Sequence, residues 1–398
     1  MDPVRLKARV IERVDARAKD LDRIALAIHA LPELAFEERA ASTMLREALA
    51  AEGMTAPSGA GGLETAFVVE AGTGSPTVAI LAEYDALPGV GHACGHNLIA
   101  TGALGAFLAT RDVLVEAGLP GRVRLVGCPA EERGNGKAHL VRAGVFAEVD
   151  AALMFHPGDR DEGDALMLAM VTLDVELIGR AAHAAAEPHA GVNALDALLL
   201  GWTALSALRQ LVRSDSRIHG IITDGGQAAN IIPERTAARL MVRSPDNAYL
   251  EELKARVLDC FRGAARATGC ELRHLWSETC ETVTTNPALA QAFAANAASL
   301  GRTLHPRRPI DTHGSTDMGN VTSVVPGIHP FLAICDEPTP SHSHAFAEAA
   351  ATPRALETMH VAAKALAMTA LDLLAEPDLT RRARHAFGRT GEPARARR

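Results

Sequence analysis

The chain has 398 residues, of which 48% are hydrophobic and 22% charged, and its formal net charge is -8. This is the composition of a globular protein long enough for two domains, and the acidic balance argues against nucleic acid as a partner. The sequence has no run of 18 or more apolar residues, and residues 1–7 lack a secretory signal, so we expect neither a membrane span nor secretion.

The first 160 residues alternate helical periodicity with short apolar strands. The predicted elements are helices over 4–30 and on to about 51, strands over 65–69 and 78–82, a helix over 97–117, a strand over 122–128, a short helix over 138–143 and a strand over 151–155. Such alternation is typical of an α/β fold with a mainly parallel sheet.

The pattern changes near residue 170. The elements predicted there are strands over 171–178, 217–223, 235–242 and 271–276, with helices over 192–213 and 247–267. Their βαββαβ order predicts a small α+β domain of the ferredoxin-like kind. Because the α/β texture returns near residue 286, we interpret 171–284 as an insertion that divides a catalytic domain into 1–170 and 285–379. The Arg-rich tail, 380–398, is expected to be disordered.

The motif richest in potential metal ligands follows the apolar run 78–82. Residues 92–97 read His-Ala-Cys-Gly-His-Asn, which places a thiol and two imidazoles within five positions. The pair Glu131–Glu132 and then His156 follow later apolar runs in the same way. Thiolate, imidazole and carboxylate groups are the usual protein ligands of transition-metal ions. The pattern therefore suggests a hydrolase built around metal.

With these pieces in place, nearly the whole chain resembles the aminoacylase and carboxypeptidase-G family of di-metal amidohydrolases. The run from Ala82 to Asn97 resembles the branch that contains p-aminobenzoyl-glutamate hydrolase-like enzymes and a dipeptidase acting on β-alanyl-lysine-type substrates. The resemblance implies a metal-bearing α/β domain with an inserted lid or dimerisation domain, in agreement with the organisation above. It also implies a homodimer formed through the insertion.

The resemblance implies roles for individual residues. Two divalent ions would be held by Cys94, His96, Glu132, His156 and His342. Zinc is the first expectation, with manganese or cobalt as alternatives. Glu131 would be the general base, and Asp85 would orient a ligand, with a cap at the sheet end as its alternative role. We prefer His342 to His344 because it lies four residues before Phe346, as the family ligand does.

Other expected roles concern the substrate. His183, in Gly179–Ala185, resembles a lid histidine that reaches a substrate oxygen, often across the dimer, and Asn230 resembles an asparagine placed similarly. Arg243 could bind a substrate carboxylate, or be an ordinary surface residue. The segment 314–319 contains no arginine, although several relatives place a carboxylate-binding one there, which argues against an acidic, glutamate-like substrate.

The leading hypothesis is a metal-dependent amidase acting on N-acyl amino acids, aminobenzoyl amino acids or dipeptides. One alternative is an amidase that uses Cys94 as nucleophile with His96 as base. Another is a non-catalytic member of the same scaffold that binds a ligand. The six cysteines are spaced irregularly, which favours free thiols in a reducing cytoplasm over a disulfide framework.

Overall fold

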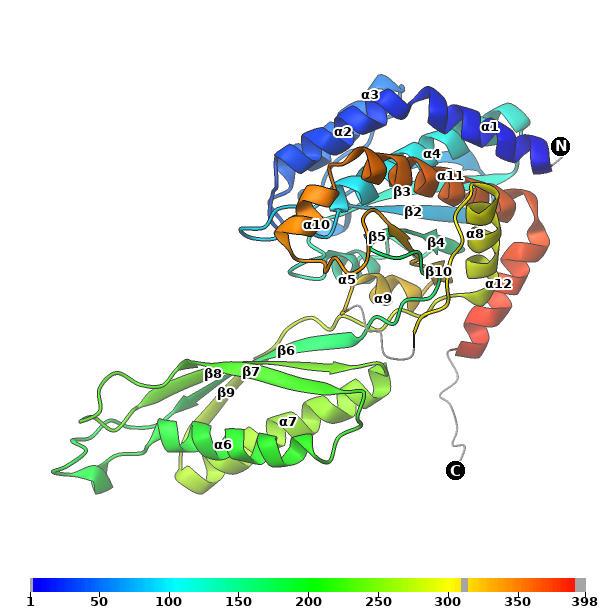
Figure 1. Cartoon of the computed structure of the whole chain (residues 1–398). Helices are drawn as coiled ribbons and strands as arrows, with labels where there is room; N and C mark the ends of the chain where they lie inside the picture. Colours follow the sequence, from blue (N-terminus) through cyan, green and yellow to red (C-terminus); the bar gives the residue numbers. More distant parts are fainter. Residues whose placement is uncertain (1–2, 309–313, 391–398) are drawn as a thin grey trace. The chain divides into compact units, whose positions relative to one another are not determined.

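The computed structural model describes residues 3–308 and 314–390, and it divides into two compact units. The first unit comprises Met1–Leu166 and Val283–Arg398, and the inserted unit comprises Met167–Thr282. The chain therefore leaves the first unit and returns to it once (Figure 1), and the inserted unit begins and ends close to the 171–284 expected from the sequence.

A five-stranded sheet in the order β1-β3-β2-β4-β10 forms the centre of the first unit. Its strands are β1 (Phe67–Thr73), β2 (Thr77–Glu83), β3 (Gly121–Cys128), β4 (Ala151–Leu153) and β10 (Gly327–Ile328). Strand β1 is antiparallel to β3, and the other neighbouring pairs are parallel, which confirms the mainly parallel sheet. A second parallel pair consists of β5 (His156–Gly158) and β11 (Phe331–Ala333).

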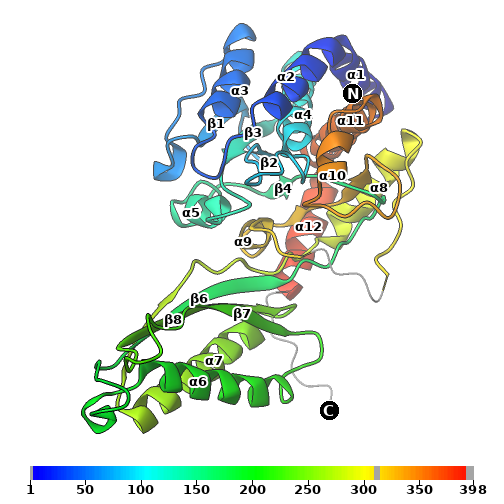
Figure 2. The same ribbon diagram turned by 60° about the vertical axis from the view of Figure 1, so that its left-hand side comes forward.

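Helices lie on both faces of this sheet (Figure 2). The helices are α1 (Pro3–Ala16), α2 (Ala18–Ala30), α3 (Arg39–Ala51), α4 (His96–Ala117), α5 (Gly136–Arg142), α8 (Pro287–Ser299), α9 (Met318–Thr322), α10 (His344–Ala349), α11 (Pro353–Ala375) and α12 (Pro377–Thr390), with a 3-10 turn at Ala60–Gly62. Alternate residues of β2 face two separate hydrophobic clusters, Ile80 packing toward α4 and α11, and Leu81 toward α5 and α9. The sheet is thus buried on both sides.

Helices α4 and α11 are long and apolar enough to cross a membrane by length and composition alone. Their most apolar windows are 83% and 78% buried inside the protein, respectively. Both pack in the larger hydrophobic cluster of the first unit. Their apolar character is therefore accounted for by their position as core helices.

The expectation of a disordered tail from residue 380 is wrong as far as Thr390, because α12 is a regular helix. Leu379 and Ala383, four residues apart on one helical face, are buried in the core. The Thr380 hydroxyl donates to the Leu373 carbonyl at 3.0 Å. This apolar stripe anchors the helix despite its many arginines, and the rest of the expected tail, 391–398, lies outside the described residues.

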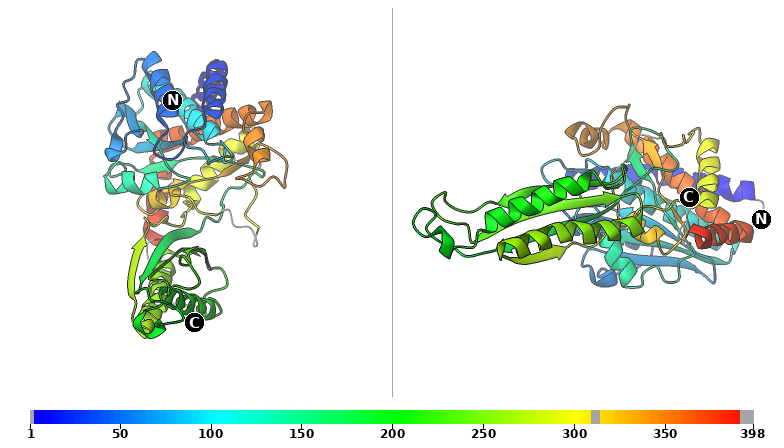
Figure 3. Two further views of the ribbon diagram at one scale, coloured as in Figure 1. Left: turned by 90° about the vertical axis from the view of Figure 1, so that its left-hand side faces the viewer. Right: turned by 90° about the horizontal axis from the view of Figure 1, so that it is seen from below.

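The inserted unit is an antiparallel sheet in the order β7-β8-β6-β9, with two helices side by side on one face (Figures 1 and 3). The elements are β6 (Ala169–Ile178), a 3-10 turn (Pro188–Ala190), α6 (Ala194–Arg209), β7 (Arg217–Asp224), β8 (Arg235–Ser244), α7 (Asn247–Thr268) and β9 (Glu271–Trp276). Their order is the predicted βαββαβ. Every second residue of β6 is buried against the helices, and this period of two sets which face points inward.

Asn286 fastens α8 and α12 together. Its side-chain oxygen accepts from the N–H groups of Ala288 and Leu289, which caps α8, while its Nδ2 donates to the Ala383 carbonyl at 2.8 Å. We predict that Asn286→Ala lowers the free energy of unfolding by roughly 2–3 kcal/mol, from a lost cap and a lost buried hydrogen bond. Asn286→Ser keeps the cap but cannot reach α12, so it should lose about half as much. Urea denaturation of both variants checks this, and equal losses would contradict the role assigned to Ala383.

Candidate active site

Several of the predicted site residues follow the ends of neighbouring parallel strands. Asp85 comes two residues after β2, Glu131 and Glu132 come after β3, and His156 begins β5 shortly after β4. Parallel strands present their carboxyl ends at one edge of a sheet, which is where α/β proteins place their sites. The sheet topology therefore gathers side chains that are far apart in the sequence.

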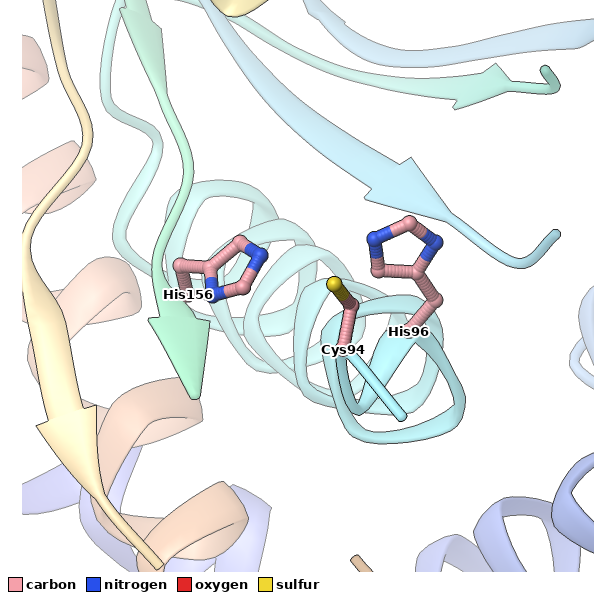
Figure 4. A group of neighbouring side chains, drawn as sticks. All are labelled: Cys94, His96 and His156. Atoms are coloured by element: carbon pink, nitrogen blue, oxygen red, sulfur yellow. The ribbon is translucent and has the colours of Figure 1, made fainter. Parts of the chain in front are cut away.

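All five predicted metal ligands, with Glu131, belong to three overlapping groups of side chains. The groups are Cys94, His96 and His156 (Figure 4); Cys94, Glu132 and His342; and His96, Glu131 and Glu132. Within each group the potential ligand atoms lie within 4.8 Å of one another. His344 is the first residue of α10 and belongs to none of the groups found among the described side chains.

A glycine turn brings Cys94 and His96 into position. Gly95 has a φ of 73°, and a Cβ there would lie 2.8 Å from the Pro157 side chain, so both the backbone and the space require glycine. Helix α4 begins at His96, whose side chain is fully buried. On the other side, the His342 backbone N–H donates to the Ala93 carbonyl at 3.0 Å, which ties the His342 loop to this turn.

Asp85 bridges two of the segments that carry ligands. The His96 Nδ1 lies 2.9 Å from the Asp85 carbonyl oxygen and 3.1 Å from its Oδ1, while Oδ2 accepts from the Glu132 N–H at 2.9 Å. Since both contacts of Nδ1 are acceptors, Nδ1 carries the proton and the Nε2 lone pair is free in the neutral ring. Asp85 thus fixes the orientation of the imidazole and the position of the turn after β3.

The His96 Nε2 has no hydrogen-bond partner among residues 3–308 and 314–390. It lies 3.5 Å from Glu83 Oε2, 3.9 Å from Glu132 Oε1 and 4.0 Å from Glu131 Oε2. A buried lone pair facing several carboxylates needs a positive charge between them. Together with the thiol and the other imidazoles, this donor set fits divalent ions such as zinc.

Burial is the main influence on the pKa values of the adjacent carboxylates Glu131 and Glu132. It raises the pKa of Glu131 well above its ordinary value, and the neighbouring Glu83, Glu132 and Asp317 carboxylates raise it further, against the opposing effect of His96. Burial also raises the pKa of Glu132, an effect that His96 opposes. A carboxylate with a raised pKa is suited to taking up and returning a proton near neutral pH.

Glu38 supports the turn that carries Glu131. Its Oε1 accepts from the N–H of Ala130 at 2.9 Å and of Phe36 at 2.8 Å, and its Oε2 accepts from the Thr65 hydroxyl at 2.9 Å. Ala130 has a φ of 62°, a left-handed conformation that costs a non-glycine residue free energy, so its backbone depends on this hydrogen bond. Sequence reasoning did not identify Glu38, whose only signal is its place in an acidic run that resembles solvent-exposed residues.

A second buried group, also missed from the sequence, adjoins the first. Glu83, Glu131 and Asp317 have oxygens within 4.8 Å of one another, and the fully buried Lys137 ammonium contacts Glu83 and, at 2.5 Å, Asp317. Lys137 is the second residue of the short helix α5, directly before the helix expected over 138–143. The available signal was a lysine in the first turn of a short helix.

In the inserted unit, His183 and Asn230 lie on adjacent segments, since the Ala184 N–H donates to the Asn230 carbonyl at 3.0 Å. The His183 Nδ1 accepts from two backbone N–H groups at 3.2 Å, which leaves Nε2 as the protonated nitrogen. Arg243 is paired with Met170 at the start of β6, whereas His183 lies beyond the end of β6 at Ile178. Eight residues of strand, roughly 26 Å, separate the two ends of this sheet.

Thiol, imidazole and carboxylate groups meet at the strand ends of an α/β sheet, and a separate antiparallel domain is inserted into the same chain. These features define the chain as a metal-dependent hydrolase. The comparisons agree. Residues 45–372 match the model of peptidase family M20/M25/M40, and the chain belongs to this family, as a dipeptidase or amidohydrolase enzyme.

Three similar proteins illustrate the relationship. The Xaa-Arg dipeptidase of Mus musculus is 41% identical over 96% of this chain and 92% of its own length. One of the polypeptides of the p-aminobenzoyl-glutamate hydrolase of Escherichia coli is 35% identical over 66% of this chain and 58% of its own length. A Bacillus subtilis structure described as a dinuclear metal binding peptidase of the M20 family has a TM-score of 0.68 and 22% identity, and covers 91% of this chain and 99% of its own.

The environment of Glu38 generates a prediction about pH. Burial, followed by the charge of Asp85, raises the pKa of Glu38 to about 7. The folded state therefore binds this proton more tightly than the unfolded state, so Glu38 costs stability as the pH rises from about 4.5 to above 7. In Glu38→Gln the amide oxygen can accept from both backbone N–H groups and the amide nitrogen can donate to the Thr65 hydroxyl, without the charge, so we expect the variant to gain about 1–3 kcal/mol at pH 8 and nothing at pH 5.

Chemical denaturation at both pH values measures this difference. Glu64→Gln is the matched control, because Glu64 is an exposed carboxylate paired with Arg39. A gain that is the same at pH 5 and pH 8 would show that the Glu38 carboxylate does not bind its proton on folding.

Proposed function

We propose that this enzyme hydrolyses the amide bond of a small dipeptide, N-acyl amino acid or aminobenzoyl amino acid. The observation that carries the proposal is the set of overlapping ligand groups that surrounds Glu131 at the sheet edge. The activities named for the mouse dipeptidase and the Escherichia coli hydrolase support this class of substrate. Among these candidates we place dipeptides first, because the mouse dipeptidase matches over nearly the full length of both chains.

Two divalent ions per chain would be held by Cys94, His96, Glu132, His156 and His342, as the Bacillus subtilis structure supports. When bound, they would lower the pKa of water and polarise the amide carbonyl. Zinc is the first choice, and manganese or cobalt can take its place, because mixed thiol, imidazole and carboxylate sites accept several divalent ions.

Glu131 is the proposed general base. Its carboxylate takes the proton of the attacking water and returns it to the nitrogen of the leaving amine, so one residue serves both halves of the reaction. The Glu38 hydrogen bond to Ala130 and the Asp85 hydrogen bond to Glu132 hold the turn on both sides of Glu131. The base is therefore fixed before substrate binds.

The proposed roles in the inserted unit are recognition and charge stabilisation. The protonated Nε2 of His183 is available to donate to the oxygen of the carbonyl under attack, with Asn230 beside it. Arg243 is proposed to bind a substrate carboxylate. Since His183 and Arg243 occupy opposite ends of one sheet, a small substrate cannot touch both in the same copy, which supports a homodimer in which the two residues come from different chains.

The alternative that uses Cys94 as nucleophile is disfavoured by the environment of the thiol. Burial raises the pKa of Cys94 well above its ordinary value, with the Glu132 carboxylate raising it further and His96 opposing. A neutral thiol is a weak nucleophile, so Cys94 is better suited to a ligand whose charge is stabilised by a metal ion. Free thiols also agree with the proposed cytoplasmic location.

Glu131→Gln tests the base. We expect kcat to fall by roughly 10²–10⁴-fold, because the amide cannot accept a proton, while the metal content stays unchanged. Steady-state kinetics and elemental analysis of the same preparation measure both quantities. Glu64→Gln serves as the control for a neutralised carboxylate that is exposed and belongs to none of the ligand groups, and a Glu131→Gln enzyme with wild-type kcat would refute the assignment.

Metal removal and a substrate panel test the reaction class. Purified wild-type protein should contain about two metal ions per chain, lose activity to a chelator and regain it with Zn²⁺ or Mn²⁺. Dipeptides with a basic C-terminal residue should be cleaved faster than p-aminobenzoyl-glutamate, since residues 314–319 offer no arginine to an acidic substrate. Activity that survives chelation and disappears on thiol alkylation would instead favour the Cys94 mechanism.

A further inference from the structure

Lys137 is the one lysine or arginine buried among the described residues of the chain. Its ammonium contacts the Glu83 carboxylate and lies 2.5 Å from Asp317 Oδ1, while its backbone N–H donates to Asp317 Oδ2 at 2.8 Å. Both carboxylates are fully buried as well. Burying three charged groups is costly unless they compensate one another, so this arrangement is built for the ammonium.

The local backbone is shaped to deliver this side chain. A Cβ on Gly136 would lie 1.8 Å from the Pro129 carbonyl oxygen, so only glycine allows α5 to begin this close to the turn after β3. Asn135, directly before it, has a φ of 54°. The backbone is thus strained where α5 begins, and this conformation places Lys137 beside the turn that carries Glu131.

The three carboxylates beside the Lys137 ammonium have the composition of a metal site. Glu83, Glu131 and Asp317 bring oxygens within 4.8 Å of one another, and carboxylate oxygens are suitable ligands for Mn²⁺ and similar ions. Glu83 has a second oxygen, Oε2, that is buried without a hydrogen-bond partner in the described part of the chain and lies 3.5 Å from His96 Nε2. This group therefore directly adjoins the ligands assigned above.

We propose that Lys137 is a tethered cation that keeps divalent ions out of the Glu83–Glu131–Asp317 group, so that Glu131 stays free of metal. The inference rests on the proposed function, in which Glu131 must accept a proton. A carboxylate bound to a metal ion cannot serve as the base at the same time. Lys137 is thus a positioning residue, which acts through Glu131 and the neighbouring carboxylates.

The test counts Mn²⁺ ions in the full-length chain. Chelated wild-type protein and Lys137→Ala are titrated with Mn²⁺, and the unbound ion is measured by its EPR signal. We expect two equivalents for the wild type and three for Lys137→Ala, in which a vacated space faces three carboxylates. Lys137→Arg keeps the positive charge and should remain at two. Two equivalents in Lys137→Ala would overturn the inference.

Activity gives a second readout. In Lys137→Ala, kcat should fall further as Mn²⁺ exceeds two equivalents, because the third ion engages the base, whereas the wild-type kcat should reach a plateau. If Lys137→Ala cannot be obtained folded, Glu83→Gln tests the inference instead. This variant should still bind two Mn²⁺ ions with affinities within threefold of the wild type. Loss of one ion would overturn the inference, because it would show that Glu83 is a metal ligand. A wild-type protein that binds no Mn²⁺ would instead refute the proposed function itself.

Discussion

The structure of the first unit depends on the burial of five carboxylates at one edge of a sheet. Glu83, Asp85, Glu131, Glu132 and Asp317 meet where β2 and β3 end, and an uncompensated buried carboxylate costs several kcal/mol. Compensation comes from the Lys137 ammonium, from the His96 ring and from backbone N–H groups donated to Asp85 and Asp317. What remains uncompensated is the space around the His96 Nε2, where divalent ions are proposed to bind.

Much of this site could be predicted from the sequence because its signals are local. Apolar runs of strand length, each followed by a polar or Gly-rich segment, identify the strands whose ends carry the ligands. Once those strands are taken as parallel, their carboxyl ends must lie together, so the proximity of Cys94, Glu132 and His156 follows from topology. The βαββαβ unit was recognisable for a similar reason, since the period of two in β6 is preserved along the whole strand.

The groups that were missed are those whose meaning depends on distant residues. Lys137 and Asp317 are 180 residues apart, and each alone is most simply interpreted as a solvent-exposed charge. Glu38 stands in an acidic stretch, and its partner Ala130 lies 92 residues away. For α12 the error had the opposite sign, since an ordered helix was expected to be disordered. That expectation rested on the many arginines and overlooked the four-residue spacing of Leu379 and Ala383, which anchors the helix. Pairing across such distances leaves no periodic signal.

The two units hold their functional groups by different physical means. In the first unit, Asp85 orients the buried His96 ring, and the Glu38 and Asp85 carboxylates hold the backbone on both sides of Glu131, so the geometry is determined by the core. In the inserted unit, His183 is exposed and its ring is oriented by two N–H groups of its own loop. Such local support is sufficient for a hydrogen-bond donor. Because the antiparallel β6–β8 ladder separates His183 from Arg243, any mechanism that uses both on one substrate requires two copies of the chain.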